Sequence, residues 1–197
     1  ELDIFENILP YIKNKIVKFL IKWSYLKANM ILTNSKTSCQ ELKKFGLKSK
    51  VIYSGSIIKL KKSKKHKKKE FLNIISVGRL TAQKDYFTLL KAIKLINIKK
   101  FIINIYGDGE LKKELAKYIE NEKIKKYVKI KGHETNKDRM YKNADLLIHT
   151  AIFEGLPNVI VEAMNYNVPV IAANSAGGTK EVLGSGKYGD LFNPGNS

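Results

Sequence analysis

The chain has almost no cysteine and no long hydrophobic segment. Cys39 is the only cysteine among 197 residues, which excludes an internal disulfide framework and favours a reducing, cytoplasmic environment. No apolar run approaches the roughly 20 residues that span a bilayer. The most apolar N-terminal stretch, residues 16–23, is interrupted by Lys18 and Lys22. The sequence starts at Glu1 without a charged-then-apolar leader, so we expect no signal peptide.

Arginine is also scarce. Arg79 and Arg139 are the only arginines among 37 basic residues, although the formal net charge is +19. Proteins that bind nucleic acid usually draw on arginine, because its guanidinium group makes bidentate contacts to phosphates and bases. The lysine excess therefore indicates compositional drift of an AT-rich genome, and we expect no nucleic-acid partner.

One segment, residues 59–69, concentrates eight lysines. It has no apolar periodicity and lies between two strand-like stretches, so an exposed linker over 59–70 is the favoured interpretation. Contact with an anionic membrane surface is the first alternative, since a lysine near such a surface contributes about 1 kcal/mol. Nucleic-acid binding is the weakest alternative, because no aromatic residues are interleaved to stack on bases. The lysines are Lys59, Lys61, Lys62, Lys64, Lys65, Lys67, Lys68 and Lys69.

Several catalytic and cofactor signatures are missing. His66, His133 and His149 lie on different predicted elements, and no Asp or His residues cluster at ligand spacing, so we expect no metal site. No Gly-x-Ser-x-Gly motif is present to form a nucleophile elbow. No Gly-x-Gly-x-x-Gly follows the first strand of the regular part, which argues against a dinucleotide cofactor. We therefore expect no cofactor.

From residue 71 onward, the apolar residues are arranged in the pattern of an α/β fold. Apolar residues make up 44% of the chain, enough for a packed core. Strands that are apolar on more than one face alternate with helices, which predicts a Rossmann-like, doubly wound parallel sheet covered on both sides. The predicted strands are 72–77, 101–106, 127–130, 146–149, 168–172 and 190–192, and the predicted helices are 87–96, 110–121, 137–142, a helix from 158, and 179–183.

Residues 1–58 form only a partial α/β segment, with too few elements to close a core alone. The expected elements are a helical stripe over 3–26 that is broken near Pro10, strands at 29–33 and 51–53, and a helix over 38–45 with Ser35 or Thr37 as its cap.

The stretch from Glu154 to Glu162 is the most informative functional feature. It follows an apolar run, bends at a glycine and a proline, and continues as an amphipathic helix. The helix N-terminus presents backbone N–H groups and a positive dipole end, which suit a phosphate. The two carboxylates suit sugar and ribose hydroxyls, because an ionised carboxylate accepts several hydrogen bonds. Glu114 and Glu122 have the same spacing but no such bend, and we interpret them as a solvated helix face.

Further candidates follow the predicted strand ends, where parallel sheets bind ligands. Arg79 and Lys84 flank a turn and can clamp a diphosphate, although ordinary surface cations are an alternative among so many lysines. His133 follows a strand where a base can meet the backbone. The turn 107–110 is interpreted as structural, with Asp108 as a candidate helix cap. The residues expected together on this rim are Arg79, Gly107, Gly132 and Glu154.

Several motifs occur in order along the regular part. They are Val77-Gly78-Arg79-Leu80 with Gln83-Lys84, Gly107-Asp108-Gly109, Ala144-Asp145, Glu154-Gly155-Leu156-Pro157 through Glu162-Ala163-Met164, Val168-Pro169-Val170-Ile171-Ala172, and Gly177-Gly178 with Glu181. Together they resemble the C-terminal donor-binding domain of the retaining, GT-B-fold glycosyltransferases of family 4. The resemblance is strong over 71–197 and weak over 25–58. It implies a donor-binding domain over 71–197 that is truncated at its C-terminus, and a remnant of the acceptor domain over 1–58.

The resemblance also implies roles for the matched residues. Glu154 is the expected catalytic residue, which holds the donor-sugar hydroxyls, and Glu162 is expected to bind the ribose. Arg79 and Lys84 are expected to hold the diphosphate. Backbone N–H groups of the donor-binding segment Gly155, Leu156, Pro157 and Asn158 assist them.

The implied activity is sugar transfer with retention, without a metal, from a nucleotide sugar. We expect a UDP-sugar as donor and a glycan or lipid-linked acceptor in bacterial cell-surface polysaccharide synthesis. The expected location is cytoplasmic, with peripheral contact at the inner face of the plasma membrane as an option. The alternative function is a non-catalytic nucleotide-sugar-binding module or an inactive fragment, because the family's acceptor domain is nearly absent.

Overall fold

The computed structural model describes residues 20, 23–44, 46–53, 70–97 and 100–196. The chain divides into two compact units, Glu1–Gly55 and Ser56–Ser197. Most of the predicted helical stripe, and all but the last residue of the predicted lysine linker 59–70, lie outside the described residues. The predicted domain limits fall in or beside the same gap, so the assignment of donor and acceptor domains stays a prediction.

The first unit contains a small β–α–β arrangement. Strand β1 (Ile31–Thr33) pairs in parallel with β2 (Ser49–Val51), and helix α3 (Lys36–Lys44) connects them. Of the two predicted caps, Ser35 is the one that acts, because its Oγ accepts a hydrogen bond from the Ser38 N–H at 3.1 Å. Thr37 lies inside the helix instead.

The second unit is built on six parallel strands, which confirms the predicted fold class. The sheet order is β10-β8-β6-β3-β4-β5. The chain therefore begins in the middle, winds out to one edge, returns beside β3, and winds out to the other edge. The strands are β3 (Leu72–Val77), β4 (Phe101–Tyr106), β5 (Val128–Gly132), β6 (Leu146–His149), β8 (Val170–Ala173) and β10 (Asp190–Phe192).

Four predicted strands have different limits in the structure. In the first unit, the strands predicted over 29–33 and 51–53 are found at Ile31–Thr33 and Ser49–Val51. In the six-stranded sheet, two strands differ. The strand predicted over 127–130 runs from Val128 to Gly132, and the strand predicted over 168–172 runs from Val170 to Ala173. In the second case the cause is local, because Pro169 has no N–H to donate to a ladder. The N–H of Val168 instead bonds to the Ala163 carbonyl at the end of the preceding helix.

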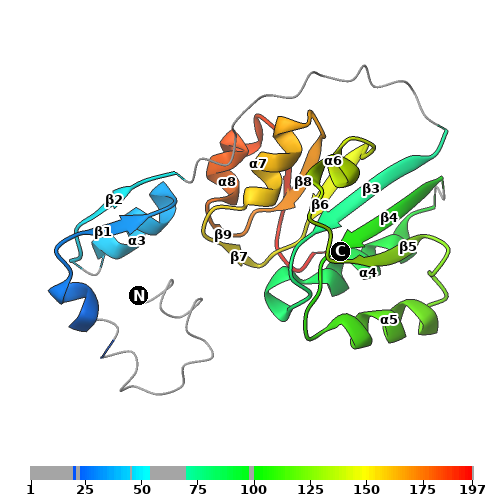
Figure 1. The fold of residues 1–197 in the computed structure, drawn as a ribbon, viewed down its shortest axis with the longest axis horizontal. Coiled ribbons are helices and arrows are strands. Elements are labelled where there is room, and N and C mark those ends of the chain that lie inside the picture. The colour runs from blue at the N-terminus through cyan, green and yellow to red at the C-terminus, as the bar shows by residue number, and fades with distance from the viewer. Residues whose placement is uncertain (1–19, 21–22, 45, 54–69, 98–99, 197) are drawn as a thin grey trace. The chain divides into compact units, whose positions relative to one another are not determined.

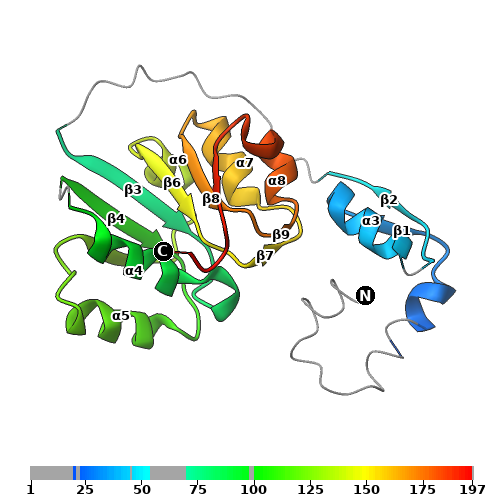
Figure 2. The same ribbon diagram turned by 180° about the vertical axis from the view of Figure 1, so that it is seen from behind.

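Helices cover both faces of the sheet (Figures 1 and 2). Neighbouring residues of β3 point to opposite faces, as the two-residue period of a strand requires. Ile74 packs in a core with helices α4 and α5, whereas Ile75 packs in a second core with α6 and α7. The helices are α4 (Tyr86–Leu95), α5 (Lys112–Asn121), α6 (Lys137–Tyr141), α7 (Asn158–Asn165) and α8 (Thr179–Val182).

A two-residue strand pair lies outside the main sheet. Strand β7 (Phe153–Glu154) pairs in parallel with β9 (Ala176–Gly177). Sequence periodicity does not predict this pair, because two residues are too few to show a period. The pair fixes the backbone at Glu154, one of the predicted site residues.

Among the helices that the structure describes, none is long and apolar enough to cross a membrane.

Candidate functional site

The site lies where the direction of winding changes, between β3 and β6. In doubly wound sheets this switch point, at the carboxyl ends of the strands, forms the ligand crevice. The short helix η1 (Ala82–Lys84), which follows β3, is attached to the segment that follows β6. The Gln83 side-chain N–H donates to the Phe153 carbonyl at 2.9 Å, and the Thr150 hydroxyl donates to the Lys84 carbonyl at 2.7 Å. The two loops therefore form one unit.

Lys84, His149 and Glu154 meet at this point. The Lys84 ammonium group forms an ion pair with Oε1 of Glu154, and Nε2 of His149 lies 3.1 Å from the same oxygen. The Lys84, Glu154 and His149 side chains are only 13%, 12% and 3% exposed. The structure thus brings the predicted catalytic residue Glu154 together with the predicted diphosphate-binding residue Lys84.

The environment keeps the Glu154 carboxyl ionised. Burial alone raises the pKa of this carboxyl, because a charged group loses hydration. The His149 hydrogen bond and the Lys84 cation outweigh that effect, so the pKa lies below its ordinary value of 4.5. At neutral pH Glu154 is therefore a carboxylate, which can accept hydrogen bonds from hydroxyl groups.

The β7–β9 pair also holds the Glu154 backbone. The N–H of Gly178 donates to the Glu154 carbonyl at 3.2 Å, and Gly177 lies against the same carbonyl. Gly177 has a φ of +106°, and a Cβ atom there would lie 1.5 Å from the Glu154 oxygen. Only glycine fits this approach without displacing the strand. This gives the matched Gly177-Gly178 motif a physical reason.

The predicted segment Gly155, Leu156, Pro157 and Asn158 joins Glu154 to helix α7. The helix begins at Asn158 directly after Pro157, and its first turn contains no acidic residue and no side-chain cap. The positive end of the helix dipole is therefore not neutralised by an acidic side chain of its own first turn. This geometry is compatible with the predicted phosphate contact, which stays a prediction.

The hydrogen bond and ion pair that Glu162 makes with the described residues do not involve the Lys84–Glu154–His149 cluster. Its Oε2 accepts a hydrogen bond from the Tyr141 hydroxyl at 2.9 Å, and its Oε1 pairs with Lys137 Nζ at 2.7 Å. Both partners come from α6. Burial, followed by the charge of Glu162, raises the pKa of the Tyr141 hydroxyl, so tyrosine remains the proton donor. The predicted ribose contact of Glu162 stays a prediction.

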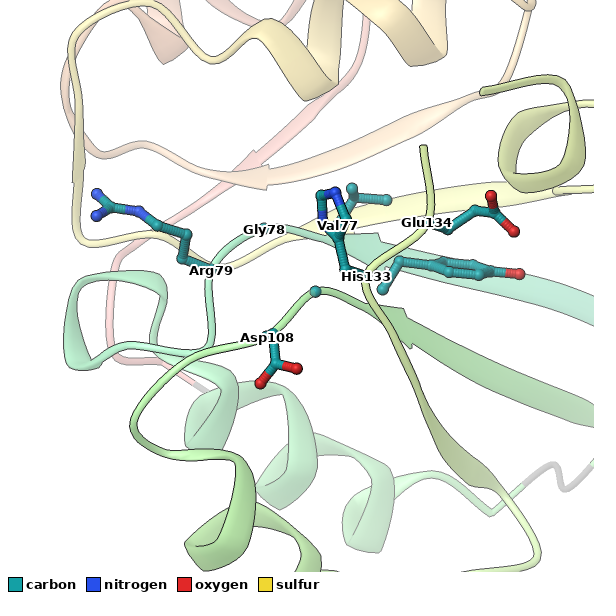
Figure 3. Close-up of a pocket in the computed structure, with 8 residues that line it drawn as sticks. Val77, Gly78, Arg79, Asp108, His133 and Glu134 are labelled. Carbon is teal, nitrogen blue, oxygen red and sulfur yellow. The ribbon is translucent and has the colours of Figure 1, made fainter. Parts of the chain in front are cut away.

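A pocket of about 260 Å³ opens beside the cluster, beyond the ends of β3, β4 and β5 (Figure 3). Arg79 and His133 are both exposed at it. Arg79 makes no ion pair with another residue that the structure describes. In Figure 3 its side chain and that of Glu134 point away from each other. The lining residues are Val77, Gly78, Arg79, Tyr106, Gly107, Asp108, His133 and Glu134.

Asp108 does not act as the predicted helix cap. Helix α5 starts after Leu111, which provides no side-chain cap. Asp108 instead accepts a hydrogen bond from the Gly109 N–H at 2.8 Å and pairs with Lys112 at 2.8 Å. The Lys112 contact, followed by the Gly109 contact, lowers the pKa of the Asp108 carboxyl. The helix therefore begins at Lys112, two residues later than the predicted start at residue 110.

His149 is the site residue that sequence reasoning did not assign. In β6 it points to the same face as the buried Leu147, where the strand period calls for an apolar side chain. A buried polar side chain needs a hydrogen-bond partner. A histidine at this buried strand position is the feature of the sequence that could have indicated a site residue. The sequence does not show which residue is its hydrogen-bond partner.

No group of three or more His, Cys, Asp or Glu side chains that could hold a metal occurs among the described residues. The predicted lack of a metal requirement stays a prediction.

Comparison with known proteins identifies the family. The family model described as glycosyl transferases group 1 matches residues 56–197, which include the whole six-stranded sheet. The chain belongs to this family. The match and the structural neighbours place it in the GT-B glycosyltransferase superfamily.

Relatives of the family resemble both units of the chain. An uncharacterized glycosyltransferase of Methanocaldococcus jannaschii is 30% identical over 211 residues, covering 92% of this chain and 52% of that protein. The N-acetylgalactosamine-N,N'-diacetylbacillosaminyl-diphospho-undecaprenol 4-alpha-N-acetylgalactosaminyltransferase of Campylobacter jejuni is 28% identical over 193 residues, with coverages of 92% and 52%. The chain thus spans about half the length of these curated relatives.

A solved structure shows the same arrangement. The crystal structure of HepE from Anabaena in complex with UDP-glucose has a TM-score of 0.74 and 26% sequence identity. The similarity covers 86% of this chain and 51% of that one.

Proposed function

We propose that the chain supplies the donor-binding part of a family 4 glycosyltransferase. The protein transfers a sugar with retention, without a metal, from a UDP-sugar to a glycan or lipid-linked acceptor of the bacterial cell surface. The observation that carries this proposal is the Lys84–Glu154–His149 cluster at the switch point, beside a pocket lined by Arg79. A carboxylate that accepts hydroxyl hydrogen bonds next to cations that bind phosphate suits a sugar diphosphate.

We assign to the site residues the roles that the family resemblance implies. Glu154 holds the donor-sugar hydroxyls and is the catalytic residue, while Arg79 and Lys84 bind the diphosphate. The start of α7 contributes backbone N–H groups to the same phosphates. The pocket beyond β4 and β5 accepts the base near His133, and Glu162 takes the ribose. Stabilisation of the leaving nucleoside diphosphate by fixed cations supplies much of the rate.

The names of the relatives support a nucleotide-sugar donor. The HepE structure holds UDP-glucose, and the C. jejuni relative is named as a transferase acting on a diphospho-undecaprenol acceptor. The first supports UDP as the carrier, and the second supports a lipid-linked acceptor.

A donor panel tests the proposal. UDP is titrated into the chain by calorimetry, and the full-length protein is then assayed with several UDP-sugars, with and without EDTA. We expect UDP binding, transfer that EDTA leaves unchanged, and a product of retained configuration by NMR. Binding of UDP without transfer from any donor would favour the non-catalytic alternative. Absence of UDP binding would reject the proposal.

Replacing Arg79 by alanine is expected to lower the affinity for UDP and for UDP-sugar equally, by about tenfold, because a charge-assisted contact to phosphate is lost. Arg79 makes no ion pair within the described structure, so folding should be unaffected. Calorimetric titration measures both affinities. Lys125→Ala removes an exposed cation that pairs with Glu120 at 2.5 Å and serves as the control. Unchanged affinities for both ligands would remove Arg79 from the diphosphate site.

We also propose a cytoplasmic location, with the lysines of residues 59–69 contacting an anionic membrane surface. Changing Lys61, Lys62, Lys64, Lys65, Lys67, Lys68 and Lys69 to glutamine should weaken binding to phosphatidylserine-containing vesicles by about tenfold or more at low salt. Binding should also fall as salt screens the charges. Flotation assays with neutral vesicles give the baseline, and equal flotation of both proteins would assign the segment to a plain linker.

A further inference from the structure

His149 is a buried histidine with a carboxylate partner, and it is the one member of the Lys84–Glu154–His149 cluster to which the proposed function assigns no separate role. Its side chain is only 3% exposed, and its Nε2 lies 3.1 Å from Oε1 of Glu154. It is the last residue of β6, where it pairs with Ala172 of β8, so its backbone position is fixed by the sheet. The ring therefore provides a rigid support under the Glu154 side chain.

The contacts of Glu154 are unevenly distributed. Lys84 and His149 both bind Oε1, whereas Oε2 makes no hydrogen bond with the described residues. One oxygen of the carboxylate is thus held from two sides, and the other remains an acceptor. This arrangement selects one orientation of a side chain that could otherwise rotate.

Lys84 and His149, the two residues that hold Oε1, differ in flexibility and in the number of partners that they bind. Lys84 has a long, flexible side chain, and in the proposed function it also binds the diphosphate. His149 has a short side chain enclosed in the core and no second partner among the contacts of the site. When the Lys84 ammonium group turns toward a phosphate, His149 is the contact that continues to hold Oε1.

We propose that His149 is a positioning residue, which fixes Oε1 of Glu154 so that Oε2 accepts a hydrogen bond from the donor sugar. This inference rests on the proposed function of the site. It predicts that His149 affects the sugar part of the donor and not the UDP part. A histidine that only satisfies the core would affect both equally, through stability.

Three variants test the proposal. His149→Leu removes the donor at similar volume, and His149→Gln retains a side-chain N–H near the Nε2 position. Asn104→Leu is the matched control, because Asn104 is buried and donates to Asn73 at 2.8 Å elsewhere in the sheet. Calorimetry compares the affinities for UDP, UDP-glucose and UDP-N-acetylglucosamine.

We expect His149→Leu to reduce by about tenfold the extra affinity that a UDP-sugar has over UDP, since a hydrogen bond to a charged group is lost. Affinity for UDP should stay unchanged. His149→Gln should restore the extra affinity, and Asn104→Leu should leave it intact. An equal loss for UDP and UDP-sugar, or no loss, would overturn the positioning role. Failure of both His149 variants to fold, with Asn104→Leu folded, would overturn it as well.

A second measurement does not depend on the sugar. Carboxyl ¹³C NMR, with the Glu154 signal assigned by its loss in Glu154→Gln, follows the titration of this group. His149→Leu should raise the pKa of Glu154, and His149→Gln should leave it near the wild-type value. If no UDP compound binds the wild type, the proposed function fails, while this titration still decides the contact. An unchanged pKa in His149→Leu would overturn the inference even if donors bind.

Discussion

Replacing Glu154 by glutamine is expected to lower the rate of sugar transfer by about 10³-fold, the larger end of the loss found when one electrostatic contact to a reacting group is removed. Glutamine has nearly the same shape and can still accept a hydrogen bond from Lys84 or His149. It lacks the negative charge that balances the Lys84 cation and strengthens hydrogen bonds to donor-sugar hydroxyls. Affinity for UDP should therefore remain within about twofold.

Single-turnover assays of the full-length protein and UDP titrations measure these two quantities. Glu114→Gln is the matched control, because Glu114 belongs to a pair of glutamates with the same spacing but lies exposed in the first turn of α5. That variant should transfer sugar at the wild-type rate. Normal turnover by Glu154→Gln would remove Glu154 from the mechanism, whereas a parallel loss of UDP affinity would assign it to the nucleotide.

The sheet could be predicted from the sequence because its strands are buried on both faces. Phe101–Tyr106 and Leu72–Val77 are short, mostly apolar runs that are each followed by a glycine, and the structure has the same limits. The prediction failed at the start of β8, where the apolar run includes Pro169 but the strand begins at Val170, because Pro169 has no N–H to donate to the ladder. Hydrophobicity alone does not show where backbone donors are missing.

The cluster at the switch point could be predicted only in part. Glu154 is visible because a strand, a bend and a helix follow one another locally. Lys84 is one lysine among many, and its contact with Glu154 joins residues 70 positions apart. Such a contact depends on β6 lying next to β3, which periodicity does not determine. The partners of Glu162 were missed for the same reason, because Tyr141 and Lys137 reach it only through the packing of α6 on α7.

Replacing Lys84 by methionine is expected to reduce UDP affinity by about 100-fold and to destabilise the fold by about 3 kcal/mol, because a buried carboxylate loses its cation. Methionine keeps the length and apolar volume of the side chain. Lys94→Met is the control: Lys94 pairs with Glu122 at 2.5 Å, but its side chain is 47% exposed, so the loss of stability there should be much smaller than for Lys84→Met.

The pH dependence of this destabilisation has a definite sign. Lys84 helps to lower the pKa of Glu154 below 4.5, so the ion pair contributes stability above that pH and loses it as the carboxyl is protonated. The difference between Lys84→Met and wild type should therefore be largest at neutral pH and shrink on acidification below about 4.5. Urea unfolding at several pH values measures it.

A double variant separates the two effects of Lys84. In Lys84→Met/Glu154→Gln the uncompensated charge is gone, so most of the lost stability should return. The affinity for UDP should stay low, because no cation has been restored next to the phosphates. Recovery of both stability and UDP affinity would mean that Lys84 serves only to neutralise Glu154. Recovery of neither would mean that the aliphatic part of the Lys84 side chain is needed for packing. Recovery of stability alone would identify Lys84 as a phosphate ligand that also pairs with the Glu154 carboxylate.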